Sequence, residues 1–378
     1  MRLANWPRAR LRLGMVGGGL GGNIGAAHRT AALMDGRWDL VAGALSRDPR
    51  RGAESARAWQ IAPDRSYPNA AEMAEAEAGR NDGIQAVAIC TPNADHHPSA
   101  MAFLKAGIHV ICDKPLTTSV ALAEELVRTA KDQGLIFAVT HTYSGYPMVR
   151  AARRMIAAGQ IGEVRSVSVE YLSQYHTAGS EGWQNDPARN GPLGAVAGTG
   201  THAHHLAEFI TGRRVTELSA DLASLGPGNR LDDHATMHLR FDNGARGCLW
   251  NSTIAPGNQN GLSIRVHGST GGLSWHQERP EELAYTPFGG ATRLLYRNGA
   301  EVAAGAFELS RVPAGHPEGY LEAFANLYSE IAEAVTARLD GSADPEVAFP
   351  TVEDGLRGVR FMFAALSSAR NESRFENL

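Results

Sequence analysis

One segment near the N-terminus constrains the fold of this chain more than any other. The apolar run Leu13 to Val16 leads into the stretch GGGLGG at residues 17–22, and a helical pattern begins at Ile24. The stretch contains the spacing Gly-x-Gly-x-x-Gly between a strand and a helix. Glycines at these three positions permit a tight turn, let a pyrophosphate approach the backbone and allow close packing of helix on strand. The segment therefore predicts a dinucleotide site, with the phosphates at the helix N-terminus.

Short apolar runs continue to alternate with helical stretches up to about residue 140. Such alternation predicts βαβ units and hence a parallel sheet with right-handed crossovers. Further strands are expected at residues 40–44, 86–89, 109–112 and 136–140, and helices at 24–34, 49–59, 98–106 and 119–133.

The pattern changes after about residue 141. Strands with alternating polarity, separated by turn-forming residues, indicate a mostly antiparallel sheet. Strands are expected at 164–171, 215–222, 236–241, 245–253, 262–267 and 271–275, and helices at 148–158, 319–337 and 351–370. The predicted fold class is α/β: a doubly wound parallel sheet of Rossmann type over residues 1–141, then an α+β domain over residues 142–378 with a large, mostly antiparallel sheet. The second domain is expected to bind substrate and form oligomers, with the C-terminal helix free to pack back on the first.

Composition narrows the classes of function. The 378 residues carry a formal charge of −4 without a basic stripe, which argues against nucleic-acid binding. No apolar segment approaches the roughly 18 residues of a membrane helix, and none resembles a signal peptide. The three cysteines form no CxxC motif, which is typical of a reducing compartment. We therefore expect a cytoplasmic protein that acts on a small molecule.

Further motifs lie at the ends of later strands. Thr91-Pro92-Asn93 with His96 follows one strand, and Asp113-Lys114-Pro115 follows the next. Gly159-Gln160-Ile161-Gly162 and Gly200-Thr201-His202 lie in the second domain, where His202 is expected to open a helix. With these motifs and the glycine-rich stretch, the chain resembles the Gfo/Idh/MocA family of oxidoreductases over nearly its whole length.

Residues 140–150 and 315–328 are most similar to the inositol 2-dehydrogenase and L-glucose dehydrogenase branch of that family. This resemblance implies NAD-linked oxidation of a ring hydroxyl in a cyclic polyol, sugar or sugar derivative. The chemistry requires a base for the hydroxyl proton and a cation near the developing alkoxide. Lys114, at the carboxyl end of a strand, is the predicted cation. His202 is the predicted acid/base, because a histidine with a pKa of about 6.5 exchanges protons near neutrality.

The residues leave the choice between NAD and NADP open. An NAD site usually has Asp or Glu at the end of the second strand, where this chain has Ser46-Arg47-Asp48. Ser46 and Arg47 suit a 2′-phosphate; alternatively, Arg47 covers the adenine while Asp48 caps the next helix. The resemblance favours NAD, with NADP as the alternative. The expected cofactor-binding residues are Gly17, Gly19, Leu20, Gly21, Gly22, Asn23, Ile24, Ser46, Arg47, Thr91, Pro92, Asn93, His96, Asp113 and Lys114.

Two positions depart from the family pattern. The family has Asp four residues before the catalytic histidine, where this chain has Gly198. The nearest branch has Trp-Arg before Asp-Pro, whereas here Trp183-Gln184 precedes Asn185-Asp186-Pro187. The neutral amide of Gln184 binds anions and vicinal hydroxyls less strongly than a guanidinium would. We expect Lys114 and His202 to suffice, on a substrate with different groups at the reacting carbon.

The substrate pocket is expected to draw on polar and aromatic side chains. Tyr171 and Asp186 suit hydrogen bonds to a polar ring, although Asp186 before a proline equally suits a turn. His141 and Tyr143 follow the last strand of the first domain, and His316 precedes a helix that it could simply help to begin. The predicted substrate-binding residues are Lys114, His141, Tyr143, Tyr171, Trp183, Gln184, Asp186, His202 and His316.

Metal binding is not predicted. His202, His204 and His205 splay over different faces of a helix, unlike ligands spaced at i and i+4. Two alternative functions stay open: a redox-neutral enzyme that keeps NAD bound during epimerisation or elimination, and a non-catalytic NAD-binding sensor. The departures from the family pattern favour the sensor, and the two catalytic candidates disfavour it. An exposed apolar sheet face in the second domain predicts a homodimer or homotetramer.

Overall fold

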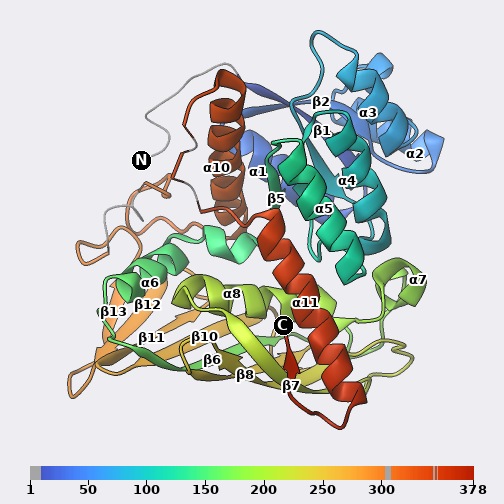
Figure 1. Cartoon of the computed structure of the whole chain (residues 1–378). Helices are drawn as coiled ribbons and strands as arrows, with labels where there is room; N and C mark the ends of the chain where they lie inside the picture. The colour runs from blue at the N-terminus through green and yellow to red at the C-terminus, as the bar shows by residue number, and fades with distance from the viewer. Residues whose placement is uncertain (1–9, 303–307, 344, 347) are drawn as a thin grey trace. The chain divides into compact units, whose positions relative to one another are not determined.

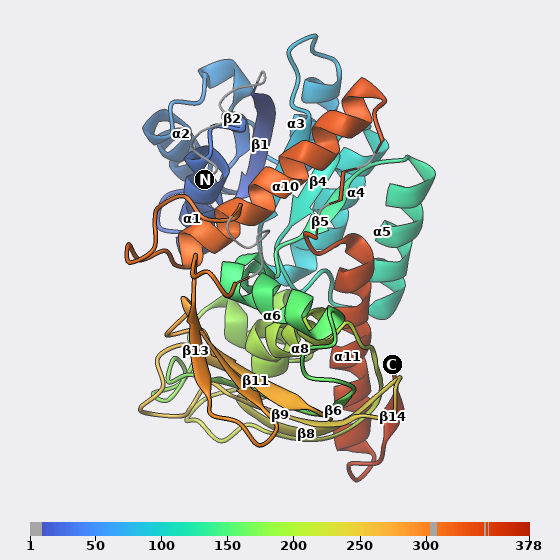
Figure 2. The same cartoon turned by 90° about the vertical axis from the view of Figure 1, so that its left-hand side faces the viewer.

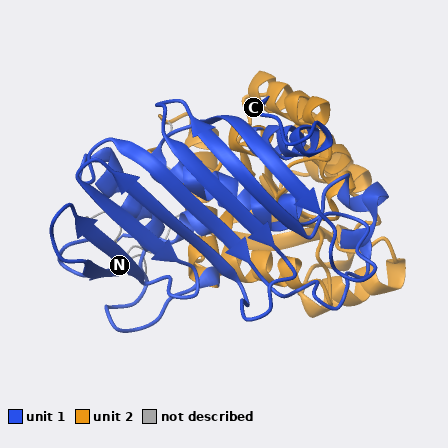
Figure 3. Cartoon of the chain, turned by 90° about the horizontal axis from the view of Figure 1, so that it is seen from below, with its two compact units in different colours: residues 1, 143–320, 357–378 blue, residues 2–142, 321–356 orange. Residues whose placement is uncertain are grey.

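The computed structural model describes residues 10–302, 308–343, 345–346 and 348–378. These residues form two compact units, coloured separately in Figure 3. Unit 2 contains residues 10–142 and 321–356, and unit 1 contains residues 143–320 and 357–378. The sequence-based division was a single cut after residue 141, whereas in the structure residues 321–356 return to the N-terminal unit. This difference arises because the helix Tyr320–Asp340 packs on the helix Asn23–Met34, far away in sequence.

Unit 2 is built on a five-stranded parallel sheet with the order β2-β1-β3-β4-β5. Its strands are β1 (Leu11–Gly17), β2 (Trp38–Ala44), β3 (Ala86–Cys90), β4 (His109–Cys112) and β5 (Phe137–Val139). The residues of β3, β4 and β5 are all buried, as expected of strands covered on both faces. The strand order reverses between β1 and β3, which places a ligand crevice at their carboxyl ends.

Helices cover both faces of the parallel sheet (Figures 1 and 2). On one face α3 (Ala70–Ala78), α4 (His96–Lys105) and α5 (Val120–Asp132) pack side by side. On the other face α1 (Asn23–Met34) meets α10 (Tyr320–Asp340): the ring of His28 lies edge-on 4.6 Å from that of Phe324, and its Nδ1 lies 2.7 Å from the Tyr328 hydroxyl. Burial lowers the pKa of His28 to about 4, so this histidine is neutral in the core. Helix α2 (Pro49–Ala58) follows β2.

Unit 1 is built on a nine-stranded sheet with the order β13-β12-β11-β10-β6-β9-β8-β7-β14. All pairings are antiparallel except that of β6 with β9. The strands are β6 (Val164–Leu172), β7 (Val215–Ala223), β8 (His234–Phe241), β9 (Arg246–Ser252), β10 (Gly261–Gly268), β11 (Gly271–His276), β12 (Glu282–Pro287), β13 (Arg293–Tyr296) and β14 (Glu376–Asn377). The predicted fold class, a Rossmann-type parallel sheet followed by a mostly antiparallel sheet, is confirmed.

Helices α6 (Pro147–Ala157) and α8 (Thr201–Thr211) pack on one face of the nine-stranded sheet. Helix α11 (Val352–Arg370) ends within unit 1. Figure 3 looks onto the opposite face, which no described helix of unit 1 covers. We expected this face to be apolar, but its central strands expose mostly polar side chains such as Thr236, His238 and Arg265. Trp250, 43% exposed, is an apolar exception. Among the described helices, none is both long and apolar enough to cross a lipid bilayer.

Candidate active site

The glycine-rich loop after β1 has the conformation that its sequence demands. Gly17, Gly18 and Gly21 have φ angles of +74°, +68° and +82°, which side-chain-bearing residues rarely adopt. A Cβ atom on Gly25 would lie 2.1 Å from the Gly18 carbonyl oxygen, so α1 packs directly on the loop. The role of close packing, which the motif assigns to Gly22, falls in this structure on Gly25. Gly22 is instead the N-cap residue of α1.

The start of α1 suits the phosphates of a dinucleotide. No side chain caps this helix, so its first-turn N–H groups at Asn23 and Ile24 are not used by a capping side chain. Beside the loop, the buried Oγ1 of Thr91 has no hydrogen-bond partner among the described residues. Leu20, at the loop tip, is 42% exposed. A glycine cradle, an uncapped helix and an unpartnered hydroxyl together fit a bound dinucleotide.

The acidic and basic residues after β2 form hydrogen bonds and ion pairs within the protein. Asp48 Oδ1 accepts a hydrogen bond from Arg51 N at 2.9 Å, and Ser46 Oγ accepts one from Asp48 N at 3.1 Å. Asp48 therefore caps the helix, as one of the two alternatives for this segment expects. Arg47 pairs with Asp95 at 2.5 Å, and Arg51 Nη2 donates to the Leu20 carbonyl at 2.8 Å. Sequence reasoning did not identify Arg51, whose contact with the glycine loop depends on tertiary structure.

The loops after β3 and β4 are tied together by His96. Its Nδ1 lies 2.8 Å from the Pro115 carbonyl oxygen and its Nε2 lies 2.9 Å from that of Thr91. The side chain is 1% exposed. A cofactor contact of His96 stays a prediction; in the structure both ring nitrogens contact backbone carbonyls. His96 supports the short helix η3 (Asn93–Asp95) and the Lys114 loop, while Pro92 precedes η3 and Asn93 opens it.

Lys114 follows β4, so it lies at the carboxyl ends of the parallel strands, where the glycine loop also lies. Asp113 Oδ1 accepts hydrogen bonds from Lys114 N at 2.8 Å and from Thr140 Oγ1 at 3.0 Å, which fixes the loop. Burial lowers the pKa of Lys114, and the charge of Asp113 partly opposes this shift. Ionisable groups with shifted pKa values in clefts are common at active sites. His141, also in unit 2, is buried, and its backbone N–H donates to Val139.

His202 lies in unit 1 near the start of α8. A π-helical turn, η6 (Val196–Gly200), runs directly into α8, and His202 is the second residue of α8, so it lies at the start of the helix as expected. Its side chain is 8% exposed. The ring centroid lies 4.8 Å from that of Tyr143, nearly perpendicular to it, and 6.3 Å from that of Tyr171. π-Helical turns are rare and often occur at functional sites.

The two tyrosines beside His202 form a closed hydrogen-bonded ring with Asn260. The hydroxyls of Tyr143 and Tyr171 lie 2.5 Å apart, Tyr171 donates to Asn260 Oδ1 at 2.7 Å, and Asn260 Nδ2 donates to Tyr143 at 3.3 Å. Burial raises the pKa of both tyrosines, so they stay protonated. The structure thus brings Tyr143, Tyr171 and His202 together as predicted site residues. Asn260, in the turn before β10, was not singled out from the sequence.

Other predicted substrate-binding residues have visible structural roles. Asp186 Oδ1 accepts a hydrogen bond from Ala188 N at 3.1 Å and caps the short helix α7 (Pro187–Asn190), which is the turn role we also considered. Trp183 opens a 3₁₀ turn and Gln184 is exposed. His316 is exposed, and its carbonyl accepts a hydrogen bond from the buried Arg297.

The neighbouring histidines of α8 are not arranged as metal ligands. His204 stacks on Phe361 with ring centroids 4.3 Å apart, whereas His205 stacks on Phe209. Burial lowers the pKa of His205 to about 3. Within the part of the chain that the structure describes, no group of three or more His, Cys, Asp or Glu side chains could hold a metal ion.

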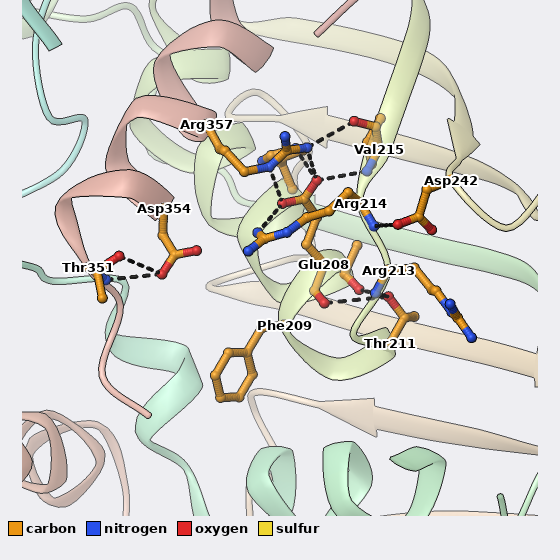
Figure 4. Close-up of polar contacts among 12 residues, drawn as sticks. Glu208, Phe209, Thr211, Arg213, Arg214, Val215, Asp242, Thr351, Asp354 and Arg357 are labelled. Carbon is orange, nitrogen blue, oxygen red and sulfur yellow. Dashed lines mark hydrogen bonds and ion pairs between the residues drawn. The ribbon is translucent and has the colours of Figure 1, made fainter. Parts of the chain in front are cut away.

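A buried ion cluster anchors the helix that carries His202. Glu208, near the end of α8, accepts hydrogen bonds from Arg357 of α11, from Arg214 Nη1 at 2.9 Å and from Val215 N at 2.7 Å (Figure 4). His204 Nε2 lies 3.5 Å from the same carboxylate. Burial alone would raise the pKa of Glu208, but His204 and Arg357 outweigh it and hold the pKa well below its ordinary range. The carboxylate therefore joins α8, α11 and β7.

We expect Glu208→Gln to lower the melting temperature at neutral pH by about 5 °C or more, because it removes one partner of a buried ion cluster. Since the pKa of Glu208 is lower in the folded than in the unfolded chain, its stabilisation is complete above an unfolded pKa of about 4.5 and is lost below it. The difference between the wild type and this variant should therefore shrink as the pH falls below that value. Glu217→Gln, which breaks the exposed pair with Arg240, should change the melting temperature little. Equal effects of both variants would contradict this account.

Both units match family models. Residues 11–141 match the oxidoreductase family with an NAD-binding Rossmann fold, and residues 149–274 match the GFO/IDH/MocA C-terminal domain. The chain therefore belongs to the Gfo/Idh/MocA family of oxidoreductases, as the sequence motifs indicated. Its N-terminal domain is the NAD-binding domain of that family.

Individual relatives are similar over nearly the whole chain. The curated protein "Uncharacterized oxidoreductase YfiI" of Bacillus subtilis (strain 168) is 34% identical, covering 96% of this chain and 95% of that protein. A crystal structure of an oxidoreductase from Sinorhizobium meliloti is 47% identical with a TM-score of 0.90, covering 98% of this chain and 100% of that one. An inositol dehydrogenase homologue from Azotobacter vinelandii, complexed with NADH and myo-inositol, is 36% identical with a TM-score of 0.92. It covers 100% of this chain and 99% of that one.

Proposed function

We propose that this protein is an NAD-dependent dehydrogenase that transfers a hydride from a ring carbon of a cyclic polyol, sugar or sugar derivative. The observation that carries the proposal is Lys114: a lysine with a pKa lowered by burial, on the same sheet edge as a glycine cradle. The similarity to an inositol dehydrogenase homologue solved with NADH and myo-inositol supports the substrate class.

The proposed roles follow from the chemistry of the reaction. NAD, when bound, accepts the hydride. His202 takes the proton of the reacting hydroxyl, since a histidine can serve as acid and base near neutrality. Lys114 stabilises the negative charge that develops on the oxygen. Tyr143, Tyr171 and Asn260 hydrogen-bond to one another, so both tyrosine hydroxyls have partners. The ring of Tyr143 packs against His202 and orients it.

The binding of the cofactor is assigned to residues of unit 2. The glycine loop and the first turn of α1 would hold the pyrophosphate. Thr91, beside this loop, offers a hydroxyl that no described residue hydrogen-bonds. Ser46 and Arg47 would lie at the adenosine ribose, and Asp113 acts on Lys114 through the loop that it fixes.

The test is absorbance at 340 nm with NAD or NADP across inositols, L- and D-aldoses, uronates and glycosides. Reduced nucleotide formed with one compound class would support the proposal and identify the substrate class. Product formation without net reduced cofactor would instead favour redox-neutral chemistry on bound NAD. No turnover, with NAD still raising the melting temperature, would favour the sensor.

Gly198 allows a test of whether the missing carboxylate matters. A Cβ atom on Gly198 would meet no atom within 4 Å, so the position has room for the Cβ that Gly198→Asp adds. If Lys114 and His202 suffice, this variant should leave kcat/KM on the best substrate nearly unchanged. Gly198→Ala is the matched control for the added Cβ alone. A gain of about 100-fold or more on inositols or simple aldoses, the size of a general acid–base contribution, would mean that the site is a degraded polyol dehydrogenase.

The open face of the nine-stranded sheet is proposed to bind a second copy of the chain, giving a homodimer or homotetramer. Exposed Trp250 lies beside the exposed Thr236 of the neighbouring strand, and such a mixture of aromatic and polar side chains is typical of oligomer interfaces. Light scattering coupled to gel filtration would give the number of subunits. A monomer at all concentrations would contradict this proposal.

A further inference from the structure

An ion pair joins the two loops that flank the glycine loop. Arg47 Nη2 and Asp95 Oδ1 lie 2.5 Å apart, Arg47 in the loop after β2 and Asp95 in the short helix after β3. Because β1 lies between β2 and β3, this pair joins the segments on either side of β1 at the carboxyl end of the sheet, where such sheets bind their ligands. The glycine loop touches both flanks: Gly19 N donates to the Leu45 carbonyl at 3.2 Å, and a Cβ on Gly17 would lie 2.8 Å from the Cys90 carbonyl oxygen.

The charges on the β2 side of this crevice are already engaged. Asp48, the first acidic residue after β2, caps α2 through Arg51 N. The guanidinium of Arg51 donates to the Leu20 carbonyl. The side chain of Arg47 is 77% exposed, and its guanidinium forms an ion pair with Asp95, whose side chain is 25% exposed. The carboxylate that pairs with Arg47 thus comes from the short helix after β3.

We propose that Asp95 makes this chain prefer NAD over NADP by holding and neutralising Arg47. A 2′-phosphate requires a cation that is available to it, and it would meet the negative charge of Asp95 as well. The uncharged 2′-hydroxyl of NAD meets no such repulsion. This inference rests on the dinucleotide site in the proposed function and makes Asp95 a determinant of cofactor specificity.

The experiment measures binding, not turnover. Dissociation constants for NAD and NADP are determined by calorimetry on the full chain for the wild type and Asp95→Asn. The variant frees Arg47 and removes the negative charge, so NADP should bind about tenfold more tightly, a modest gain because the pair is partly solvated. Binding of NAD should change much less. High salt should reduce the gain for NADP, since the gain is electrostatic.

Two further variants keep the test decisive. Asp39→Asn removes the same charge from a pair with Arg10 at the opposite end of β2, and should leave the ratio of the two dissociation constants unchanged. Arg47→Ala removes an exposed cation and leaves Asp95 unpaired, so NADP should bind more weakly than to the wild type. In Asp95→Asn/Arg47→Ala the gain for NADP should disappear.

An unchanged ratio in Asp95→Asn, or an equal shift in Asp39→Asn, would overturn the role of Asp95. Tight binding of NADP by the wild type would overturn it as well. Failure of the dinucleotide site is a different result, because neither nucleotide would then bind to any variant. Failure of the proposed dehydrogenase activity would leave these binding constants unaffected.

Discussion

Replacement of Lys114 by Gln is expected to lower kcat by about 10²–10⁴-fold on any substrate that reduces NAD, because the variant removes the cation next to the developing alkoxide. Gln keeps much of the length of the side chain but carries no charge. The glycine loop and the start of α1 are unaffected, so NAD should still raise the melting temperature. The measurement is the initial rate at 340 nm at saturating NAD.

The matched control for this variant is Lys105→Gln. Lys105 is exposed at the end of α4, in the same unit, and should turn over like the wild type. Since Lys114 has a lowered pKa, part of the lost rate should also appear as a changed dependence of kcat on alkaline pH. If Lys114→Gln kept more than about one tenth of the wild-type rate, the result would contradict a catalytic role for this lysine.

Replacement of His202 by Asn should cause a loss of similar size, about 10²–10⁴-fold in kcat, because the proton of the reacting hydroxyl then lacks an acceptor. Asn preserves polarity and fits within the volume of the imidazole, beside the ring of Tyr143. The acidic limb of the pH–rate profile should disappear together with the rate. That change separates a proton-transfer role from a purely structural one.

A second histidine of the same helix provides the control. His205→Asn removes a buried ring that stacks on Phe209, so this variant should melt at a lower temperature but keep kcat within a few-fold of the wild type. If His202→Asn lowered only the melting temperature, and His205→Asn lowered kcat as much, proton transfer by His202 would be ruled out.

The fold could be predicted from the sequence to a large extent because local patterns determine it. Apolar runs next to glycine and proline mark β1, β3 and β4, and the turn residues mark the antiparallel strands. Helix α3 was not predicted, although Asn69 and Glu72 form a cap at its start: Asn69 Oδ1 accepts a hydrogen bond from Glu72 N at 2.9 Å. A closer reading of cap residues would have found it.

The candidate site could be predicted only where a motif carries the chemistry. The glycine loop, Lys114 and His202 follow from motifs, and the structure brings Tyr143 and Tyr171 to His202. Sequence analysis did not identify Asn260, Arg51 and Asp95, because their roles depend on contacts between residues distant in sequence. The ligand contacts of His96 and Asp186 stay predictions: in the structure the His96 ring contacts backbone carbonyls after both β3 and β4, and Asp186 accepts a hydrogen bond from the backbone N–H of Ala188.

Hydride transfer itself is most directly measured with a substrate deuterated at its ring carbons. The absorbance screen at 340 nm identifies the substrate class. The reduced nucleotide is then isolated after one turnover, and its mass is measured by mass spectrometry. The account predicts that the reduced nicotinamide carries one deuterium and that Lys114→Gln forms almost none of it. Converted substrate with unlabelled or still oxidised cofactor would contradict hydride transfer to nicotinamide as the reaction of this protein.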